Sequence, residues 1–499
     1  MKKEECTERK FFSFVFKKLE KLKFQDLHTG AKMPLPNDLK DKFIEIVEVN
    51  HVLTDPSLYG PYTDDFTDHY KSQPLVILRP NSTEQVSQII KLCAENRLGV
   101  VVQGGNTNLT GSASTSTPDS EVLISLTRMK NLVSVDTKGD SMVVEAGMTL
   151  ADVHKCAEDN GKFFPLSFAA EGNATIGGCL ACNAGGVAVL RYGTTRELVL
   201  GIEVVLPDGR IWNGLRSLRK DNTGYDLKNL FMGSEGTLGV ITKVVLKLFP
   251  IPKEKETSLV CVESPAKAVA LLNRVKDSAG SLLTAFELIS EKPISRVKKN
   301  LPDVEVPELS PSPWKVLLEL SLFEKKEESV LESILEQAFE AEEITDAIIA
   351  NSLKDSHKFW HVRESIPLAD RTEGGSIHSD ISLPIASIPE FLEVSLKRLK
   401  EEFPWIEDSI FGHLGDGNLH YNFVSPEDPT LTYRFEEEIR RNLYTTVIEY
   451  NGSISAEHGI GMLKKHHNDE FKDPIELELM KKIKNAIDPE GIMNPGKLI

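Results

Sequence analysis

The sequence predicts an α+β protein of at least two domains, the second of them built on an antiparallel sheet. The chain has 499 residues, enough for two or three domains at about 150 residues each. Short apolar runs alternate with amphipathic helical stretches as far as Pro250, as in a domain of mixed strands and helices. Beyond residue 259 come further strands, a Pro-rich stretch and a hairpin signal, which favour antiparallel pairing.

The first half predicts strands and helices in alternation. An apolar run at 75–78 reads as a strand, and Ser82 with Gln85 just beyond it marks the start of a helix. Pro250 and Pro252 mark a domain boundary. Further strands are predicted at 100–102, 122–126, 142–146, 199–206 and 240–248.

The second half of the sequence predicts a domain with a different pattern of strands and helices. Residues 289–313 are expected to be irregular, and the charged stretch 324–343 to form an exposed helix. Asp416-Gly417 predicts the turn of a hairpin. The other expected elements are strands at 259–262, 316–320 and 381–383 and helices at 266–277 and 388–402.

Composition excludes several classes of protein. With 58 Lys and Arg against 75 Asp and Glu, the net charge of −17 argues against a nucleic-acid partner, which would require a basic surface. A hydrophobic fraction of 40% is ordinary for a globular protein. No apolar run approaches the roughly 20 residues that span a bilayer. The sequence therefore predicts a soluble protein.

The six cysteines indicate a reducing compartment, so the predicted location is cytoplasmic. None follows Cys261, so the second half cannot supply the four thiolates of an iron–sulfur cluster, and any electrons must pass to another molecule. The N-terminus lacks the features of a secretory leader. Residues 11–23 form a basic amphipathic stretch, which either lies on an anionic membrane surface or packs on its own domain.

Glycine placement is the informative feature of the first half. Glycine-rich loops occur at 103–108, 172–178, 183–186 and 233–239. Because glycine permits close backbone approach, such loops can direct several N–H groups at one phosphate, and together they predict a ligand with a central pyrophosphate, such as a dinucleotide. For any single loop, a tight turn is the alternative. No G-x-G-x-x-G occurs, which excludes the Rossmann turn, and the pair Cys179-x-x-Cys182 is predicted to be structural.

Ionisable groups gather in the second half. His413 and His420 flank Asp416-Gly417, so a hairpin there would bring the two imidazoles together, with His420 and Asn422 on one face. Glu457 and His458 follow. Two histidines and a glutamate favour a site for Zn²⁺ or Mn²⁺ with a position open to substrate, and hydrogen-bonded structural histidines are the alternative. Outside this setting, solvated side chains are predicted for His357, His361, His466 and His467.

With these segments the chain resembles flavoproteins of the vanillyl-alcohol oxidase type. The similar branch holds D-lactate dehydrogenase, the glycolate oxidase flavoprotein subunit and D-2-hydroxyglutarate dehydrogenase. The resemblance runs from about residue 75 to the C-terminus. It rests on Q-G-G-N-T-N, I-G-G-x-x-A-x-N-A-G-G, L-R-K-D-N-T-G-Y-D-L, G-S-E-G-T-L-G, G-H-L-G-D-G-N-L-H, A-E-H-G-I-G and N-P-G-K.

The resemblance implies a two-lobed FAD-binding domain of the PCMH type at residues 46–255, after an N-terminal extension at 1–45. The expected organisation continues with a cap or substrate domain at 256–455. It ends with a segment at 456–499 that returns to the FAD domain. FAD is expected to be non-covalent, because the first loop contains no histidine. The implied FAD contacts are Gly104, Gly105, Asn106, Thr107, Asn108, Gly172, Gly177, Gly178, Asn183, Gly185, Gly186, Gly236, Thr237, Gly239, Ile241 and Asn494.

The resemblance also assigns roles in the second half. It implies a divalent metal, usually zinc, at His413, His420 and Glu457. Arg363 matches a carboxylate-binding arginine, and a guanidinium can hold a carboxylate through two parallel hydrogen bonds. Asn422 and His458 match positions close to the substrate, with His458 as the catalytic residue. His378 departs from the pattern, because the branch usually has lysine there, and the run 367–370 is less polar than usual.

The implied activity is FAD-dependent oxidation of a D-2-hydroxy acid, D-2-hydroxyglutarate or D-lactate, to the 2-oxo acid. Arg363 would hold the C1 carboxylate, and His458 would take the hydroxyl proton while C2 passes hydride to flavin N5. Electrons would leave to an external acceptor, an electron-transfer protein or a quinone.

Two alternatives stay open for the function. The first is oxidation of another alcohol, an amine or a sugar on the same scaffold. The second is a glycolate oxidase-like flavoprotein subunit of an electron-transfer complex. The basic N-terminal stretch is the feature that favours peripheral membrane contact. A homodimer is also left open.

Overall fold

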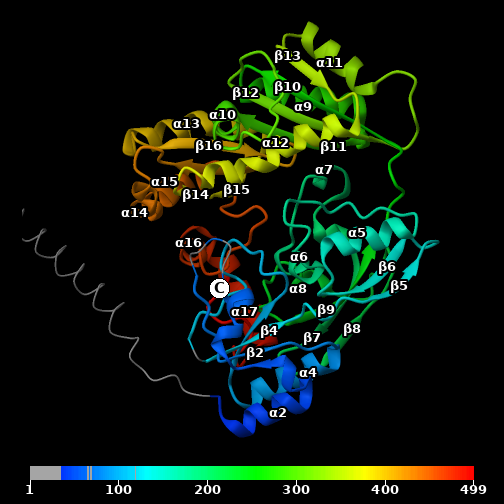
Figure 1. Cartoon of the computed structure of the whole chain (residues 1–499), viewed down its shortest axis with the longest axis vertical. Helices are drawn as coiled ribbons and strands as arrows, with labels where there is room; N and C mark the ends of the chain where they lie inside the picture. The colour runs from blue at the N-terminus through cyan, green and yellow to red at the C-terminus, as the bar shows by residue number, and fades with distance from the viewer. Residues whose placement is uncertain (1–34, 65–66, 68–69, 119) are drawn as a thin grey trace, which may run out of the picture.

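The computed structural model of the chain describes residues 35–64, 67, 70–118 and 120–499. Two sheets and their helices form a first domain, and the cap lies across from it (Figure 1). The last helices return to the first domain. The amphipathic stretch predicted at 11–23 lies outside the described residues. Among those that are described, no helix is both long and apolar enough to cross a membrane.

The first lobe is a four-stranded sheet in the order β1-β2-β4-β3. β2, β4 and β3 run parallel, and the predicted strands at 75–78, 100–102 and 122–126 are confirmed. The predicted helix start is also confirmed, because the Ser82 hydroxyl accepts a hydrogen bond from the backbone N–H of Gln85 at 3.2 Å. The bounds are β1 Val52–Leu53, β2 Val76–Leu78, α4 Thr83–Glu95, β3 Gly99–Gln103 and β4 Glu121–Ser125.

Helix α2 (Asn37–Val47) belongs to the core of this lobe. It buries Leu39, Phe43 and Val47 in the cluster that contains the β2 and α4 side chains. The predicted end of the N-terminal extension, after residue 45, therefore falls inside a packed helix. The periodic apolar positions of α2 were the signal for this packing.

The second lobe is a five-stranded antiparallel sheet in the order β5-β6-β9-β7-β8. The predicted strands at 142–146, 199–206 and 240–248 are its three central members. The edge strands β5 and β8 were not predicted, because they are largely exposed and their apolar runs are only two residues long. The bounds are β5 Leu132–Asp136, β6 Ser141–Glu145, α5 Leu150–Asp159, α6 Ile176–Cys182, β7 Val199–Val205, β8 Ile211–Gly214 and β9 Val240–Lys247.

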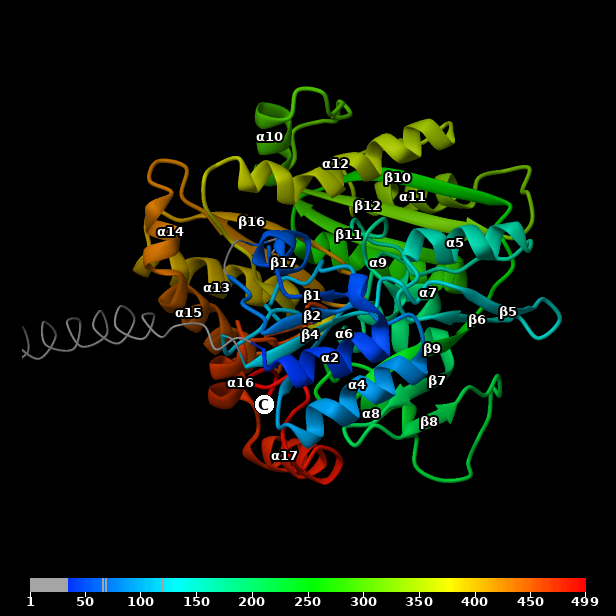
Figure 2. The ribbon, with the colours of Figure 1, turned by 60° about the horizontal axis from the view of Figure 1, so that its bottom comes forward.

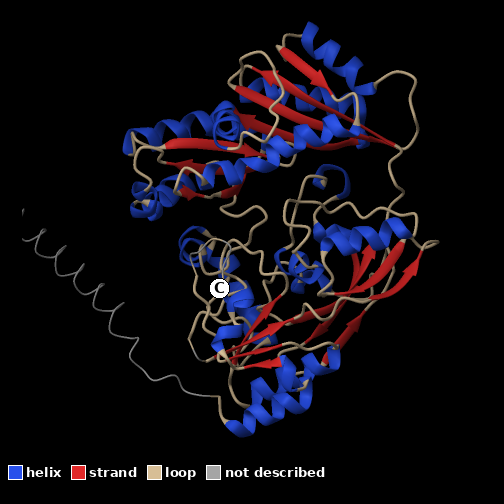
Figure 3. Cartoon of the chain, in the orientation of Figure 1, coloured by secondary structure: helices blue, strands red, loops and turns tan. Residues whose placement is uncertain are grey.

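The cap is an eight-stranded sheet whose pairs are all antiparallel, as predicted. Figure 3 shows its strands as one layer with helices along it. The bounds are β10 Glu254–Val262, α9 Pro265–Ala279, β11 Leu283–Ser290, α10 Glu291–Asn300, β12 Trp314–Leu322, α11 Val330–Glu340, β13 Asp346–Ile349, α12 Leu353–Arg371, β14 Ser376–Ile377, β15 Asp380–Ser382, α13 Ile388–Glu402, β16 Glu407–Gly412, β17 Asn418–Val424, α14 Thr430–Arg434 and α15 Glu436–Glu449.

Two cap predictions are corrected. The stretch 289–313 was expected to be irregular but contains α10. Its Pro293 sits in the first turn, where no helical hydrogen bond is lost, and Ile294 and Val297 are buried. The exposed helix expected at 324–343 is shorter, and one face of α11 is buried, with Leu331 and Ile334 in the main cap core.

The C-terminal segment is hydrogen-bonded to the first domain. Val100 donates its N–H to the Ile492 carbonyl, and Asn494 donates to the Val100 carbonyl, both at 2.8 Å. Figure 2 shows α16 (Lys465–Phe471) and α17 (Pro474–Ile487) beside the first domain. The prediction of a solvated His467 is wrong, because Tyr444 and Phe471 pack on its ring and leave it fully buried. The exposed His357, His361 and His466 agree with their prediction.

Candidate active site

A cavity of about 1330 Å³ is lined by the first domain, the cap and the C-terminal segment. Its wall includes the loops after β3 and around α6, one side of α12 and the β16–β17 hairpin. Ligand pockets commonly occupy about 300–1,000 Å³, so this one has room for a dinucleotide and a small substrate.

The loop that follows β3 packs against the segment before α6 so closely that only glycine fits. A Cβ on Gly105 would lie 1.8 Å from the Asn173 carbonyl oxygen, and one on Gly104 would lie 2.0 Å from Thr175 Oγ1. Side chains are excluded at both positions, which leaves the backbone open toward the cavity.

Buried polar atoms in the cavity wall lack partners. Both side-chain amide atoms of Asn108 and the hydroxyl of Thr175 have no hydrogen-bond partner within the described part of the chain. Buried polar groups in folded proteins are almost always paired, so these atoms indicate where a polar ligand would bind. A dinucleotide such as FAD, with its phosphates and ribityl hydroxyls, fits this requirement.

The residues predicted to bind the cofactor divide into two groups. The cavity wall contains Gly104, Gly105, Asn106, Thr107, Asn108, Gly177, Gly178, Gly186, Gly236, Gly239 and Ile241. The other group does not line the cavity; Gly172 is exposed, and several of the other members support the wall from behind. Its members are Gly172, Asn183, Gly185, Thr237 and Asn494.

Asn494 illustrates this supporting position. Its amide nitrogen donates to the carbonyl oxygens of Ser112 and Glu235, at 2.9 and 2.6 Å. The C-terminal segment thereby fixes two loops that form the wall.

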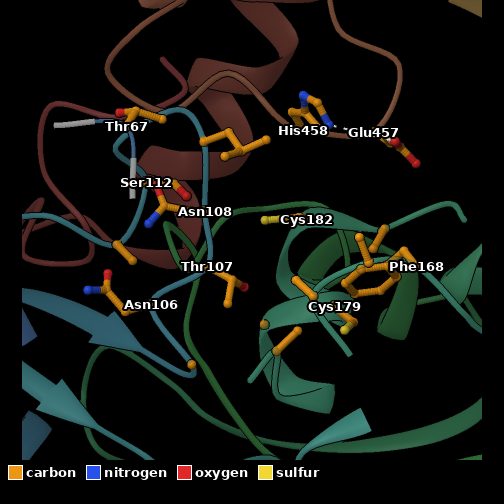
Figure 4. Close-up of a pocket in the computed structure, with 18 of the residues that line it drawn as sticks. Thr67, Asn106, Thr107, Asn108, Ser112, Phe168, Cys179, Cys182, Glu457 and His458 are labelled. Carbon is orange, nitrogen blue, oxygen red and sulfur yellow. Dashed lines mark ion pairs between the residues drawn. The ribbon is translucent and has the colours of Figure 1, made fainter. Parts of the chain in front are cut away.

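Cys179 and Cys182 lie on α6 at the same cavity, beside Phe168 (Figure 4). Burial raises the pKa of each thiol to about 12, so both stay protonated at neutral pH. This environment agrees with the structural role predicted for the pair.

The predicted hairpin is confirmed and brings the imidazoles together. Phe411 on β16 pairs with His420 on β17, and the rings of His413 and His420 lie 5.4 Å apart. Glu457 Oε1 lies 4.0 Å from His413 Nε2 and 3.7 Å from His420 Nε2. The ring nitrogens of His413 and His420 and the carboxylate of Glu457, which lies 37 positions after His420 in the chain, thus point at one small volume.

His458 lies against the same carboxylate. Its Nε2 is 3.6 Å from Glu457 Oε1, and its ring stacks on that of His420 at 5.7 Å between centroids. The side chain keeps 24% of its surface exposed, and both it and Glu457 line the cavity (Figure 4). His458 can therefore reach both the donor cluster and a substrate.

Glu287, on β11, supports this cluster from behind. Its Oε1 lies 2.5 Å from His413 Nδ1, and its Oε2 accepts from Arg363 Nε at 2.8 Å. Burial alone would raise the pKa of Glu287, but the charges of His413 and Arg363 outweigh it and hold the pKa at about 2. A histidine that binds a metal through one nitrogen usually gives the other to a carboxylate, so the donor set fits a divalent cation of the zinc type.

Asp380, on β15, fixes the backbone of the loop that carries His458. Its Oδ2 accepts the N–H groups of Ala456, Glu457 and His458 at 2.9–3.0 Å. Burial would raise its pKa, but the neighbouring His458 and Lys464 charges hold it far below its usual range. Although Asp380 is close enough to join a metal-binding group with His420, Glu457 and His458, these bonds already use its oxygen.

Glu235 holds the next turn of the same loop. Its two carboxylate oxygens accept the N–H groups of Ile460 and Gly461, both at 2.7 Å. The first domain and the cap thus each supply one buried carboxylate to the segment that carries His458.

Arg363 lies at the cap side of the cavity. It is on α12, only 8% exposed, and its guanidinium carbon is 4.8 Å from the centre of the Phe411 ring. Glu287 occupies Nε, and within the described residues neither terminal nitrogen has a hydrogen-bond partner. These two nitrogens can hold a carboxylate in the cavity.

Asn422 and His378 complete the predicted substrate group. Asn422 follows His420 on β17 at the spacing of one strand face, and both line the cavity. His378 is exposed, with Nε2 2.8 Å from the Ser376 hydroxyl. The structure therefore places the three predicted substrate residues, Arg363, His378 and Asn422, on the cap side of the cavity.

Sequence reasoning missed Glu287, Asp380 and Glu235 as parts of the site. Glu287 interrupts the apolar run of β11, and a carboxylate in a fully buried strand is a usable signal for a partner. Glu235 lay inside a quoted glycine motif, but only its glycines were considered.

Comparisons with known proteins agree with this geometry. Residues 74–214 match the family model described as "FAD binding domain", and residues 251–498 match "FAD linked oxidases, C-terminal domain". The chain has a fold like that of p-cresol methylhydroxylase, with a TM-score of 0.73 at 18% identity over 92% of this chain and 96% of the other. Alkyldihydroxyacetonephosphate synthase gives 0.71 at 17% identity, over 94% and 87%. The protein is an FAD-dependent oxidoreductase of the PCMH fold, as predicted.

Curated relatives are more similar in sequence. A D-2-hydroxyglutarate–pyruvate transhydrogenase of Saccharomyces cerevisiae is 35% identical over 89% of this chain and 90% of its own length. A D-2-hydroxyglutarate dehydrogenase of Stutzerimonas stutzeri is 34% identical, over 92% and 98%. The mitochondrial enzyme of Bos taurus is 36% identical, over 91% and 82%. The chain belongs to the family of FAD-linked oxidases and dehydrogenases that contains these proteins, which confirms the resemblance.

Replacing Gly105 by alanine is expected to weaken FAD binding about tenfold or more. The new methyl group would meet the Asn173 carbonyl oxygen at 1.8 Å, and such overpacking costs about 1–3 kcal/mol, where about 1.4 kcal/mol is tenfold. The measurement is the FAD retained per chain after gel filtration, from flavin absorbance. Gly172→Ala is the matched control, because a Cβ there meets nothing within 4 Å. Equal FAD retention by the two variants would contradict the prediction.

Proposed function

We propose that the protein oxidises a D-2-hydroxy acid, D-2-hydroxyglutarate or D-lactate, to the 2-oxo acid and passes the electrons to an external acceptor. The observation that carries the proposal is the position of the buried guanidinium of Arg363 beside the His413, His420, Glu457 and His458 cluster, in one cavity with the glycine loops. The names of the relatives, D-2-hydroxyglutarate dehydrogenase and D-lactate dehydrogenase, support the same substrate class.

Each of these residues has a separate role in the proposed reaction. Arg363 binds the C1 carboxylate through its terminal nitrogens, and Asn422 orients the substrate beside it. His458 accepts the hydroxyl proton as general base, on a backbone that Asp380 holds in place. FAD, when bound, supplies the oxidant, since flavin N5 accepts hydride from C2. A divalent cation, zinc by preference, at His413, His420 and Glu457 would stabilise negative charge on the substrate oxygens.

His378 bears on the choice between the two substrates. Its ring is exposed and bonded to Ser376, and a neutral imidazole binds a second carboxylate less strongly than a lysine would. We therefore include both the monocarboxylate and the dicarboxylate as candidates.

Anaerobic titration of the yellow protein tests the function. D-lactate or D-2-hydroxyglutarate is expected to bleach the flavin absorbance, and the L-enantiomers are not. Turnover with an artificial dye acceptor by the isolated chain then tests whether electrons leave to an external carrier. Bleaching by an amine, a sugar or another alcohol alone would contradict the proposed substrate class.

The metal assignment has its own prediction. His413→Ala is expected to lower the zinc content of the purified protein by one ion per chain, because it removes one of three proposed ligands. Metal analysis by mass spectrometry is the measurement, and FAD content checks that the cavity is intact. His357→Ala, at an exposed histidine on α12, is the control. Zinc at the wild-type level in His413→Ala would remove His413 from the ligand set.

A further inference from the structure

A second cluster of metal-binding side chains lies outside the cavity, between α15 and α16. It consists of Glu437, His466 and His467, whose ligand atoms all lie within 4.8 Å of one another. Glu437 Oε2 is 3.0 Å from His466 Nε2 and 3.4 Å from His467 Nε2, and the two rings lie 3.9 Å apart. Both imidazoles are thus directed at one carboxylate oxygen.

His467 is the unexplained member of this cluster. Its side chain is fully buried, yet neither ring nitrogen has a hydrogen-bond partner among the residues that the structure describes. A buried polar group without a partner calls for a ligand.

We propose that Glu437, His466 and His467 bind a divalent cation of the zinc type, at a second site separate from the cavity. Two imidazoles and one carboxylate are a donor set that Zn²⁺ prefers, and they leave a fourth position for water. Glu437 and His466 are about half exposed, at 46% and 53%, so the ion can enter from solvent while His467 closes the site from inside.

The surrounding charges are compatible with this site. Arg441 Nη2 lies 3.3 Å from Oε1 of Glu437, the oxygen that does not face the imidazoles, and 3.2 Å from Glu470. The arginine therefore orients the carboxylate and is itself balanced by Glu470. Lys465 is paired with Asp469 at 3.4 Å. The side-chain charges of Arg441 and Lys465 thus pair with oxygens other than Glu437 Oε2, the one that faces the two imidazoles.

The second site lies between the cap and the segment that returns to the first domain. α15 belongs to the cap, whereas α16 begins in the segment that returns to the first domain. Lys464, just before α16, donates to the carbonyl oxygen of Ile454, close to the loop that carries His458. A bound ion would cross-link α15 to α16 and so tie the cap to this segment.

Zinc binding by the full-length FAD-loaded protein tests the proposal. Chelator-treated protein is titrated with Zn²⁺ against a chromophoric zinc indicator. Two ions per chain are expected for the wild type and one for Glu437→Gln or His466→Ala. Both substitutions are at half-exposed side chains, so the variants should fold, and unchanged FAD content and Tm without zinc verify it. His357→Ala is the control and should match the wild type.

The His413→Ala variant separates this site from the proposed active-site metal. In that background added zinc should still raise the Tm, because an ion that binds only the folded state stabilises it, and the further change Glu437→Gln should abolish the rise. If only the active-site proposal fails, the wild type binds one ion and Glu437→Gln none. Equal zinc stoichiometry in the wild type, Glu437→Gln and His466→Ala would overturn the second site.

Discussion

His458→Ala is expected to slow the reduction of the bound flavin by a D-2-hydroxy acid about 10²–10⁴-fold, the range typical of a lost general base. His458 is the only imidazole of the cluster whose backbone N–H is held by Asp380, and its ring faces the cavity with 24% of its surface exposed. The proton of the substrate hydroxyl then has no positioned acceptor. Stopped-flow measurement of flavin bleaching under anaerobic conditions gives the rate directly.

Three controls isolate the proton-transfer step. FAD content and zinc content of His458→Ala should equal those of the wild type, because Asp380 bonds to backbone groups that the substitution retains. Added imidazole should restore part of the rate. The exposed His361→Ala, on α12, should bleach like the wild type. A wild-type bleaching rate in His458→Ala would remove this residue from the chemistry.

Local signals predicted most of the fold, and the failures occurred where burial is decided by distant contacts. Ser82 fixed the start of α4 because a capping hydroxyl acts within one turn. Strands β5 and β8 carry apolar runs of only two residues, and as edge strands they are largely exposed. α10 was missed because Pro293 suggested an irregular chain, although proline is tolerated in a first helical turn.

The same distinction applies to the candidate site. The hairpin that joins His413 to His420 could be predicted because its turn residues lie between them in sequence. Glu287 could not, because it reaches His413 across 126 positions, and only the β11–β16 pairing brings the two together. Asp380 and Glu235 likewise act on a loop contributed by another part of the chain.

Glu287→Gln is expected to destabilise the protein by about 3–5 kcal/mol, the usual effect of removing one partner from a buried charge pair. Glu287 is fully buried between Arg363 and His413, so the substitution leaves a buried guanidinium without its countercharge. It also releases His413 Nδ1, and loss of such a support typically weakens metal binding about 10–100-fold. Thermal unfolding and zinc titration measure the two effects, with the exposed Glu308→Gln as control.

The pH dependence of the Tm distinguishes the loss of the Glu287 charge from a change in packing. Because the folded-state pKa of Glu287, about 2, lies below its ordinary 4.5, the stabilisation by its carboxylate is fully present above pH 4.5 and is lost as the pH falls toward 2. Burial would lower the pKa of His413, but the Glu287 charge outweighs it and raises that pKa from 6.5 to about 9. The difference in Tm between wild type and Glu287→Gln should therefore be largest between pH 4.5 and 6.5, shrink below pH 4.5, and shrink again as the pH rises toward 9 and His413 loses its proton. A difference that persists unchanged toward pH 2 would show that packing, not charge, makes Glu287 important. No difference at any pH would mean that Arg363 and His413 hold their positions without it.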